Sequence, residues 1–526
     1  MSAAPSSAPP MTSPLARRVL WVLLAWMGLG LAARLVVWAL QGGYHYPDEI
    51  FQQLEPGYWL QTGVGWLPWE FGRGLRTWLV PAEYGGFLEV LSWLGLRGLD
   101  AQRVIVLHHA LWSLTLIPAG YRIGRILGAE SSFKTQPAAA GPPDVRPTLS
   151  GGPFGLDRAT LTGLAIAFFM ALLPTLLYWT PHTLQGTPGL LCFTWGLVHW
   201  LEGTRAETAQ AARRAAFWVG FWFGLTGVFR FTAGFFMVVP IIAMLVRPNP
   251  HLSRLATLGR VLLGAAGPVL ALGVVDWATW GKPFHSIIEH IKYNYIEGGA
   301  SDHGKSPTLF YLAVAVWARL GPLAPLIVAV ALAGLKRTWL LLLTAALPLV
   351  LLSTVPHKEE RFLMNQWPIF AAMLGVGLVT LVTLVRSKTA HLASGRVAAE
   401  GLGLVLGLSL LATNALGTAP TDVPFIDGQQ PHDLQWRERA DIFAAQDFVG
   451  RQPDASGLLL HDRQHLNGGY VVMGRTIPQV PFNRRLLAAS VFDYAALPTD
   501  GPEAKVVLRA GWHAVQTFET ITVYRR

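Results

Sequence analysis

Residues 18–40 read RVLWVLLAWMGLGLAARLVVWAL, an apolar run long enough for one helix to cross the hydrocarbon core of a bilayer. Runs of about 17 to 25 residues recur along the chain. The 526 residues are 52% hydrophobic and only 14% charged. Backbone amides cannot stay unpaired in lipid, and the runs do not alternate with period two, so helices are expected and a barrel is excluded. The sequence therefore predicts a mostly α, multi-pass membrane protein.

Basic residues indicate how these runs are threaded. Beginning with Arg17 and Arg18, they gather on alternate connections, as the positive-inside rule expects of cytoplasmic segments. The net charge of +10 thus serves topology, and with no compact basic domain we expect no nucleic-acid partner. The connections of opposite parity, residues 41–100, 180–187, 281–307 and 355–365 and the tail from 419, are expected outside the cytoplasm. About eleven spans follow, over residues 18–40, 103–126, 159–179, 188–203, 215–229, 231–247, 259–280, 308–335, 338–354, 366–386 and 398–418.

Composition divides the chain into three parts. Residues 1–17 are predicted to be a disordered N-terminus, and residues 18–418 the transmembrane domain. Residues 41–100 form its first outer loop, and the Pro-, Gly-, Ala- and Ser-rich residues 129–157 a flexible cytoplasmic insertion. The tail, 419–526, is predicted to be a small extracytoplasmic α/β domain, with a helix over 432–450 and strands over 457–460, 470–473, 504–508 and 520–524. The single cysteine, Cys192, lies in an apolar run and is expected to be buried.

The first outer loop contains a segment that is unusually polar for this chain, HYPDEIFQQLE over residues 45–55. On a helix, Asp48, Gln52 and Glu55 would share one face, and such a stripe suits sugar hydroxyls. Pro47 followed by Asp48 and Glu49 is also typical of a helix start, so capping is the alternative interpretation.

Further along the same loop, Trp69, Glu70 and Arg76 offer an aromatic plane, an acceptor and a cation. The alternative is an interfacial aromatic belt with a structural ion pair.

Cations gather in another outer segment, PHKEERF over residues 356–362. His357, Lys358 and Arg361 can clamp a phosphate or diphosphate through charge-assisted hydrogen bonds, or else snorkel to lipid headgroups. Arg230, between two short apolar runs, is a further candidate for substrate binding, because a charged residue within a membrane-spanning region is often functional. Polar residues from 276 to 311, including Tyr293 and Asn294, also offer partners for a sugar.

Together these motifs resemble the membrane mannosyltransferases that use dolichyl-phosphate mannose, glycosyltransferase family 22, which includes GPI mannosyltransferase III and Alg9-like enzymes. The resemblance spans about residues 20 to 420. Tyr46 stands where the family has His, one place after His45, and Thr77 stands where it has Ser. The matching motifs are Pro47-Asp48-Glu49 with Phe51-Gln52 and Glu55, Trp69-Glu70 with Arg76 and Pro81, and His357-Lys358-Glu359-Glu360-Arg361-Phe362 with Pro368.

The resemblance implies a C-type glycosyltransferase (GT-C) fold and an inverting transfer of mannose from a polyprenyl-phosphate donor to a hydroxyl of a lipid-linked or glycan acceptor. Asp48 is expected to be the base. Glu49 is expected to orient the acceptor or to act as the base in place of Asp48. The predicted substrate-binding residues are His45, Gln52, Glu55, Trp69, Glu70, Arg76, Arg230, His357, Lys358 and Arg361.

No cofactor or metal is expected, since the outer segments hold no Asp-x-Asp motif. A chain rich in Arg, Ala and Gly and poor in Lys favours a bacterial cytoplasmic membrane over the endoplasmic reticulum. Three alternatives stay open: a transferase using another polyprenyl-linked sugar of the arabinose or aminoarabinose type, a transporter or flippase, and a non-catalytic scaffold.

Overall fold

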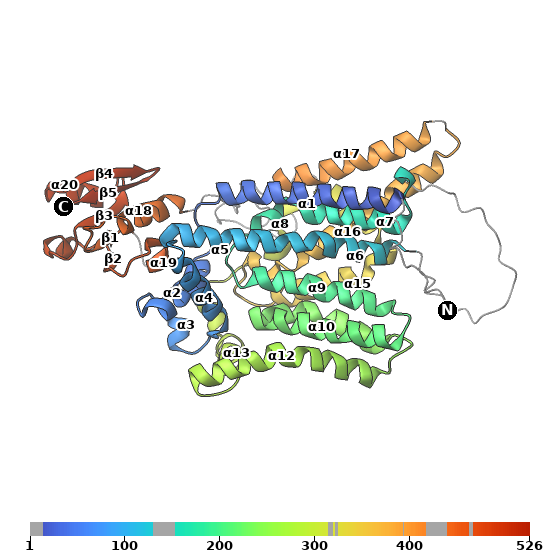
Figure 1. Ribbon diagram of the computed structural model, residues 1–526, viewed down its shortest axis with the longest axis horizontal. Coiled ribbons are helices and arrows are strands. Elements are labelled where there is room, and N and C mark those ends of the chain that lie inside the picture. Colours follow the sequence, from blue (N-terminus) through green and yellow to red (C-terminus); the bar gives the residue numbers. More distant parts are fainter. Residues whose placement is uncertain are drawn as a thin grey trace, which may run out of the picture.

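The protein is a long helical bundle that carries a small sheet domain at one end (Figure 1). The computed structural model describes residues 14–129, 153–313, 319–320, 324–392, 394–416, 439–461 and 467–526. The helices before the sheet domain are α1 (Pro14–Leu40), α2 (Glu55–Thr62), α3 (Trp69–Gly72), α4 (Leu79–Trp93), α5 (Gly98–Trp112), α6 (Leu116–Gly128), α7 (Arg158–Leu172), α8 (Pro174–Trp179), α9 (Gly186–Thr204), α10 (Ala209–Phe229), α11 (Gly234–Val246), α12 (Arg254–Trp280), α13 (His285–Ile291), α14 (Ala324–Ala333), α15 (Leu335–Ser353), α16 (Gln366–Lys388) and α17 (Gly395–Leu416).

Each of the eleven predicted spans overlaps one or more of these helices, although residues 308–335 are described only in part. Six helices of the described residues are long and apolar enough to cross a membrane. One of them, Gly98–Gly128, passes through a 3-10 turn between α5 and α6. The predicted span 159–179 is instead divided at Pro174, where α8 begins, because proline cannot donate the next hydrogen bond of a helix. The prediction of a mostly α, multi-pass membrane protein is confirmed.

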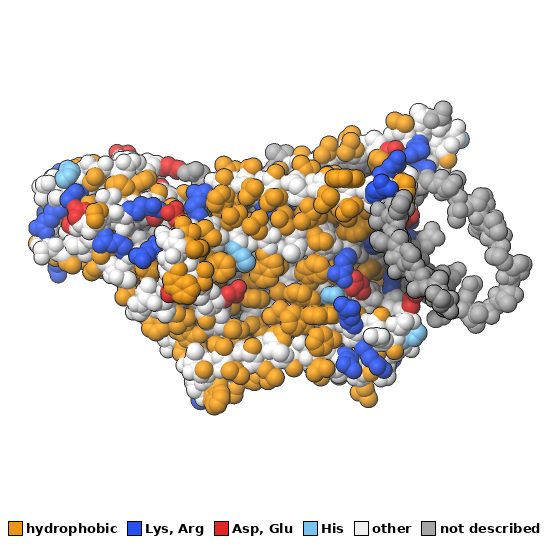
Figure 2. Space-filling view, viewed as in Figure 1, with side chains coloured by type: hydrophobic (Ala, Val, Ile, Leu, Met, Phe, Trp, Pro, Cys, Tyr) orange, Lys and Arg blue, Asp and Glu red, His pale blue; other side chains and the backbone are white. Residues whose placement is uncertain are grey.

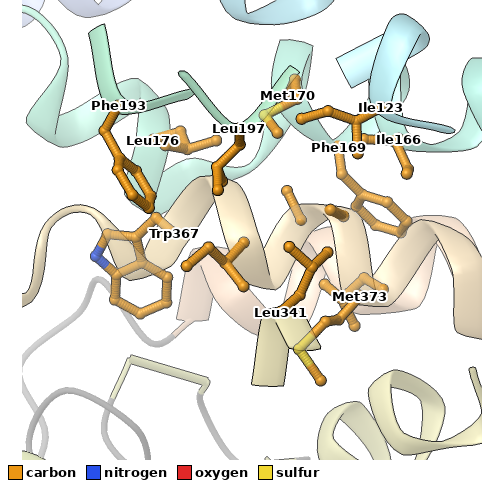
Figure 3. Close-up of a cluster of buried hydrophobic side chains, with 14 of the residues drawn as sticks. Ile123, Ile166, Phe169, Met170, Leu176, Phe193, Leu197, Leu341, Trp367 and Met373 are labelled. Atoms are coloured by element: carbon orange, nitrogen blue, oxygen red, sulfur yellow. The ribbon is translucent and has the colours of Figure 1, made fainter. Parts of the chain in front are cut away.

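Helix α16 lies at the centre of the bundle. In Figure 3, Phe169 of α7 and Phe193 and Leu197 of α9 lie on one side of α16, and Met373 of α16 points to the other side. In the most apolar part of α16, 67% of the residues are buried inside the protein, against 11% in α1. The outer surface of the bundle is correspondingly rich in exposed apolar side chains (Figure 2). Such a surface fits contact with lipid on the outside and side-chain packing on the inside.

Helices α10 and α12 approach each other closely because each has glycine at the crossing. A Cβ atom at Gly220 would lie 1.9 Å from the carbonyl oxygen of Val261, and one at Gly264 would lie 1.9 Å from that of Phe217. Small residues at such a contact let two backbones meet without a side chain between them.

The segments that parity assigns to the outer side lie together at one end of the bundle. Helices α2, α3, α4 and α13 and the C-terminal domain are all found there (Figure 1). Residues 14–17, predicted to be disordered, are instead the first turn of α1, because Pro14 suits the start of a helix and Leu15 and Ala16 extend it beyond the paired arginines. Residues 1–13 and 130–152, with most of the predicted insertion, lie outside the described residues.

The C-terminal domain has a five-stranded sheet in the order β2-β1-β3-β5-β4. Strand β1 pairs in parallel with β2 and β3, while β5 pairs antiparallel with β3 and β4. The predicted α/β class is thus observed, with its elements being α18 (Ala440–Gly450), β1 (Leu458–Leu460), α19 (Gly469–Met473), β2 (Gln479–Pro481), β3 (Tyr494–Pro498), α20 (Pro502–Arg509), β4 (His513–Phe518) and β5 (Ile521–Arg525).

Two predicted strands of this domain are helices. Residues 470–473 belong to α19, whose first N–H groups bind a carboxylate from the transmembrane domain, so a tertiary contact overrides the β propensity of the two valines. Residues 504–508 belong to α20, where Pro502 at the start and the buried pair Ala504 and Val507 are helix signals. Residues 432–438 of the predicted helix 432–450 lie outside the described residues.

Candidate active site

A cavity of about 620 Å³ opens at the end of the bundle that carries the C-terminal domain. Its wall combines segments that are far apart in sequence: the start of the first outer loop, α3 and the residues after it, the turn after α10, the α13 region and the loop between α15 and α16. Eight of the twelve predicted site residues line it, namely Asp48, Gln52, Trp69, Glu70, Arg76, Arg230, His357 and Arg361. The other four, His45, Glu49, Glu55 and Lys358, do not.

The two charged segments meet in an ion pair inside this cavity. Arg361 Nη1 lies 2.5 Å from Asp48 Oδ2, and Arg361 Nε donates to Glu359. The guanidinium carbon of Arg361 also lies 4.4 Å from the centre of the Tyr46 ring, a cation–π contact. The pKa of Arg361 is raised: burial alone would lower it, but Asp48 and Glu359 outweigh that effect. Arg361 is thus a permanent cation held between two carboxylates.

Local backbone geometry separates Asp48 from its neighbour Glu49. A helical turn begins after Pro47 and continues as a π-helical turn over Ile50–Leu54. Glu49 turns back, and its Oε1 accepts the N–H groups of His45 and Tyr46 at 2.8 and 3.1 Å. The capping interpretation therefore fits Glu49, while Asp48 faces the cavity.

Glu49 is also paired with a histidine that the sequence analysis missed. Its Oε2 lies 2.8 Å from Nδ1 of His182, in the connection between α8 and α9, and both side chains are buried. Burial would raise the pKa of Glu49, but His182 and the two backbone N–H groups together lower it. Glu49 is therefore an ionised support behind the cavity wall. No motif in the sequence marked His182, because only the fold brings it to residue 49.

His45 lies behind the same wall. Its Nδ1 is 2.8 Å from the Tyr178 hydroxyl, and burial lowers its pKa to about 3. The imidazole is therefore neutral at physiological pH, and its neighbour Tyr46 occupies the cavity wall in its place.

Glu55 points to the C-terminal domain and not to the cavity. Its carboxylate is fully buried and accepts backbone N–H groups from Trp66, Tyr470 and Val471 at 2.9 to 3.1 Å. A Cβ atom at Gly469 would lie 2.5 Å from Glu55 Oε2, so glycine is needed for this close approach. The expected polar stripe is thus broken: the π-helical turn between Gln52 and Glu55 alters the helical phase, and Glu55 fastens the outer loop to the C-terminal domain.

Side chains of the segment 357–361 alternate in direction, through an extended backbone at Glu359 followed by a 3-10 turn that begins at Glu360. The backbone at Glu359 has φ −137° and ψ 143°, and residues 357, 359 and 361 line the cavity. Lys358 turns away and donates from Nζ to the Ser306 carbonyl at 2.9 Å. Glu360 also turns away and forms a buried bidentate pair with Arg319 at 2.7 and 2.6 Å. Neither Glu360 nor Arg319 was among the predicted site residues.

The remaining wall supplies two more guanidinium groups. Arg76 lies 3.0 Å from Glu70, whose Oε1 also accepts Gln52 Nε2 at 2.9 Å. Arg230 caps α10 and donates to the Arg361 carbonyl and to the Thr232 hydroxyl, both at 3.1 Å. Among the described residues Arg230 contacts no carboxylate, whereas Arg76 and Arg361 each do. Arg230 is thus the cavity cation best placed to accept a new anion.

The rest of the wall includes aromatic and titratable side chains. Trp69 is half-exposed and its ring lies 5.2 Å from that of Tyr293, so the two form an aromatic rim. His290, which the sequence analysis did not single out, has a pKa of about 3 because of burial and the nearby Arg76 and Arg230. Glu359 has a pKa of about 2: burial would raise it, but Arg361 and His357 prevail. No group of three or more His, Cys, Asp or Glu side chains arranged to hold a metal occurs in the part of the chain that the structure describes.

The chain is similar to known proteins along most of its length. Residues 26–418 match a family model that is described as the Alg9-like mannosyltransferase family. GPI mannosyltransferase 3 of Yarrowia lipolytica is 24% identical over 328 residues, which cover 62% of this chain and 56% of that protein. GPI mannosyltransferase 3 of Drosophila melanogaster is 25% identical over 393 residues, or 70% of this chain and 60% of that protein. The matches therefore span little more than half the length of these relatives.

Among solved structures, ArnT from Cupriavidus metallidurans bound to undecaprenyl phosphate has a TM-score of 0.52 at 13% identity, covering 95% of this chain and 98% of that one. At this identity the likeness concerns the fold, which is of the GT-C type in agreement with the sequence prediction. The family match covers the charged segments that build the cavity, and on this basis the chain belongs to the Alg9-like mannosyltransferase family.

Proposed function

We propose that the protein is an inverting mannosyltransferase that moves mannose from a polyprenyl-phosphate donor to a hydroxyl of a lipid-linked or glycan acceptor. The observation that carries the proposal is a carboxylate, Asp48, facing a cavity that also holds three guanidinium groups, one of them 2.5 Å away. Transfer from a lipid phosphate needs an acceptor for a proton and cations for the leaving phosphate, and this cavity offers both.

Arg230, Arg76 and Arg361 are assigned to the donor phosphate. Arg230 has no carboxylate partner among the described residues and would bind first. Arg361 is paired with Asp48. A phosphate bound at Arg230 would compete with Asp48 for the guanidinium of Arg361. Donor binding would thus release the carboxylate at the moment when an acceptor hydroxyl needs it.

In the proposed step the acceptor oxygen forms a bond to the anomeric carbon as the bond from that carbon to the phosphate oxygen breaks. The leaving phosphate gains negative charge that the guanidiniums stabilise, and the hydroxyl proton passes to Asp48. Because an aspartate is a weak base, the proton moves late, once the attacking oxygen has become acidic. The contribution of Asp48 is therefore positioning as much as basicity. Gln52, Glu70 and the Trp69–Tyr293 rim are assigned to sugar hydroxyls and sugar faces.

Family membership and fold support this assignment. The relatives are named mannosyltransferases, and the solved structure of similar fold is described as bound to undecaprenyl phosphate, a polyprenyl phosphate. The distribution of basic residues favours a cavity on the extracytoplasmic face, and the composition favours a bacterial cytoplasmic membrane. We further propose a metal-independent reaction.

The decisive experiment incubates purified protein with radiolabelled polyprenyl-phosphate mannose and an envelope lipid extract. The expected result is a labelled product that appears only when enzyme, donor and extract are all present. A matched polyprenyl-phosphate arabinose donor serves as the comparison. Transfer from the arabinose donor alone would replace the assigned sugar, and no transfer from either donor to any extract fraction would contradict the proposal.

A further inference from the structure

A second cavity, of about 460 Å³, lies where the first outer loop meets the C-terminal domain. It shares no residue with the candidate active site, and part of its wall comes from residues 471–477, beyond the end of the family match. The wall consists of Tyr58, Gln61, Thr62, Leu88, Glu89, Ser92, Leu96, Arg97, Gly98, Ala101, Val471, Gly474, Arg475, Thr476 and Ile477.

The C-terminal domain is held firmly against this part of the loop. Glu55 binds the first N–H groups of α19, Asp447 accepts the Leu99 N–H at 3.1 Å, and Arg451 pairs with Asp100 at 2.8 Å. The cavity is therefore formed by the docking of the C-terminal domain against the first outer loop. Without that domain the α2–α4–α5 surface would be an open face.

The charged residues of the cavity favour an anion. Arg97 is exposed and makes no ion pair or side-chain hydrogen bond within the described residues. Arg475 donates one hydrogen bond, to the Gln452 carbonyl, and meets no carboxylate in the same part of the chain. The carboxylate of the cavity, Glu89, is already bound by Gln61 Nε2 and Trp93 Nε1, both at 2.9 Å. Two guanidiniums without acidic partners suit a phosphate, which they can bind through paired hydrogen bonds.

The surroundings of the cavity favour a lipid as the bearer of that phosphate. Trp93, whose indole binds the cavity residue Glu89, is 75% exposed, and the next residue, Leu94, is 70% exposed. Val90 on the same helix is 50% exposed. An exposed tryptophan beside exposed aliphatic residues is typical of the level where headgroups meet acyl chains.

We propose that this second cavity binds the phosphate of a phospholipid headgroup, with Arg97 and Arg475 as the binding cations. Trp93 and Leu94 would then contact the acyl chains. Helix α2 continues directly from the turn that holds Asp48 and Gln52. Asp48 and Gln61 are thus about 20 Å apart along one helical run, at 1.5 Å per residue. A lipid bound here would support the outer loop at a distance from the transfer reaction, and the proposal does not depend on the function assigned to the first cavity.

The test measures binding to the full-length protein, purified in a sugar detergent, by thermal shift and native mass spectrometry. The probes are dihexanoyl-phosphatidylglycerol below its micelle concentration, dihexanoylglycerol without phosphate, and inorganic phosphate. We expect a saturable rise in Tm with the phospholipid, little with dihexanoylglycerol, and a weak response to inorganic phosphate. The double variant Arg97→Ala/Arg475→Ala should weaken phospholipid binding at least about tenfold, since each charge-assisted contact is strong.

Three further variants keep the test decisive. Arg509→Ala removes an exposed cation of the same domain outside the cavity and should bind like wild type. Thr476→Trp fills the cavity mouth while keeping both arginines, so it should also weaken binding, and it covers the case in which the double variant fails to fold. Arg361→Ala should retain binding, which separates this site from the donor cavity.

Equal binding by wild type and Thr476→Trp, or equal binding of the phosphate-free lipid, would overturn the proposal. Binding of inorganic phosphate as tight as that of the phospholipid would overturn its lipid part.

Discussion

Residues 45–55 and 356–362 are both rich in charge for this chain, but the fold uses their charges differently. In the first segment the two buried acids, Glu49 and Glu55, are held largely by backbone N–H groups, so they shape the backbone. In the second, the acids Glu359 and Glu360 are each paired with an arginine. The first segment therefore uses carboxylates to fix a loop, whereas in the second Glu359 holds the cavity cation Arg361 and Glu360 holds Arg319 outside the cavity wall. The ion pair between Asp48 and Arg361 joins the two segments.

The largest expected effect tests Asp48 against its neighbours. Asp48→Asn barely changes size but removes the proton acceptor, so kcat should fall by about 10²–10⁴-fold, the usual contribution of a general base. The measurement is mannose transfer at saturating donor and acceptor. Asp500→Asn, an exposed aspartate of the C-terminal domain, is the matched control and should retain wild-type kcat. A near wild-type kcat in Asp48→Asn would show that Asp48 is not the base.

A second prediction separates the cavity cations by their partners. Arg230→Ala should raise the donor KM by about 10- to 100-fold with a smaller change in kcat, because it removes charge-assisted contacts to the phosphate. Arg361→Ala should change both constants, since Arg361 also holds Asp48.

Lys358→Ala is the control for this pair, because Lys358 donates to a backbone carbonyl away from the cavity. Its donor KM should stay within about threefold of wild type, far below the loss of a phosphate contact. A larger rise in KM for Lys358→Ala than for Arg230→Ala would reverse the assignment of the two cations.

A third prediction concerns pH and the docking of the C-terminal domain. Burial raises the pKa of Glu55 from 4.5 to about 7, although three backbone N–H groups oppose the shift. Between these values the folded protein holds a proton that the unfolded chain has lost, so the contribution of Glu55 to stability is complete below pH 4.5 and falls as pH rises through 7.

Glu55→Gln resembles the protonated form, so its Tm relative to wild type should rise between pH 5 and pH 8. Thermal melts of both proteins at the two values measure this difference. Glu207→Gln, at an exposed glutamate in the connection between α9 and α10, should show no such change. A constant difference between wild type and Glu55→Gln across the range would contradict the prediction.

The smallest expected effect is that of chelation. We expect transfer to continue unchanged in EDTA, because the guanidiniums are assigned the charge that a metal would otherwise neutralise. Loss of activity in EDTA that Mg²⁺ or Mn²⁺ restores would refute this prediction and would mean that the arginines alone do not neutralise the phosphate.

The sequence by itself determined the helical membrane architecture, the family and the two segments that meet at the cavity. Apolar runs of spanning length leave the backbone no alternative to helices, and charge is so rare here that each polar segment stands out. The C-terminal domain was less predictable. Its short segments 470–473 and 504–508 have the composition of strands. The contact of α19 with Glu55 cannot be read from the sequence, because the two are more than 400 residues apart.

Only the tertiary structure decided which charged residue faces the cavity. A π-helical turn alters the phase between Gln52 and Glu55, and an extended backbone at Glu359 sends Lys358 and Glu360 away from His357 and Arg361. The partners that hold the rotated residues, such as His182, come from other helices. Side-chain direction depends on local backbone angles and on partners distant in sequence, so a motif can place charges near a site without telling which of them enter it.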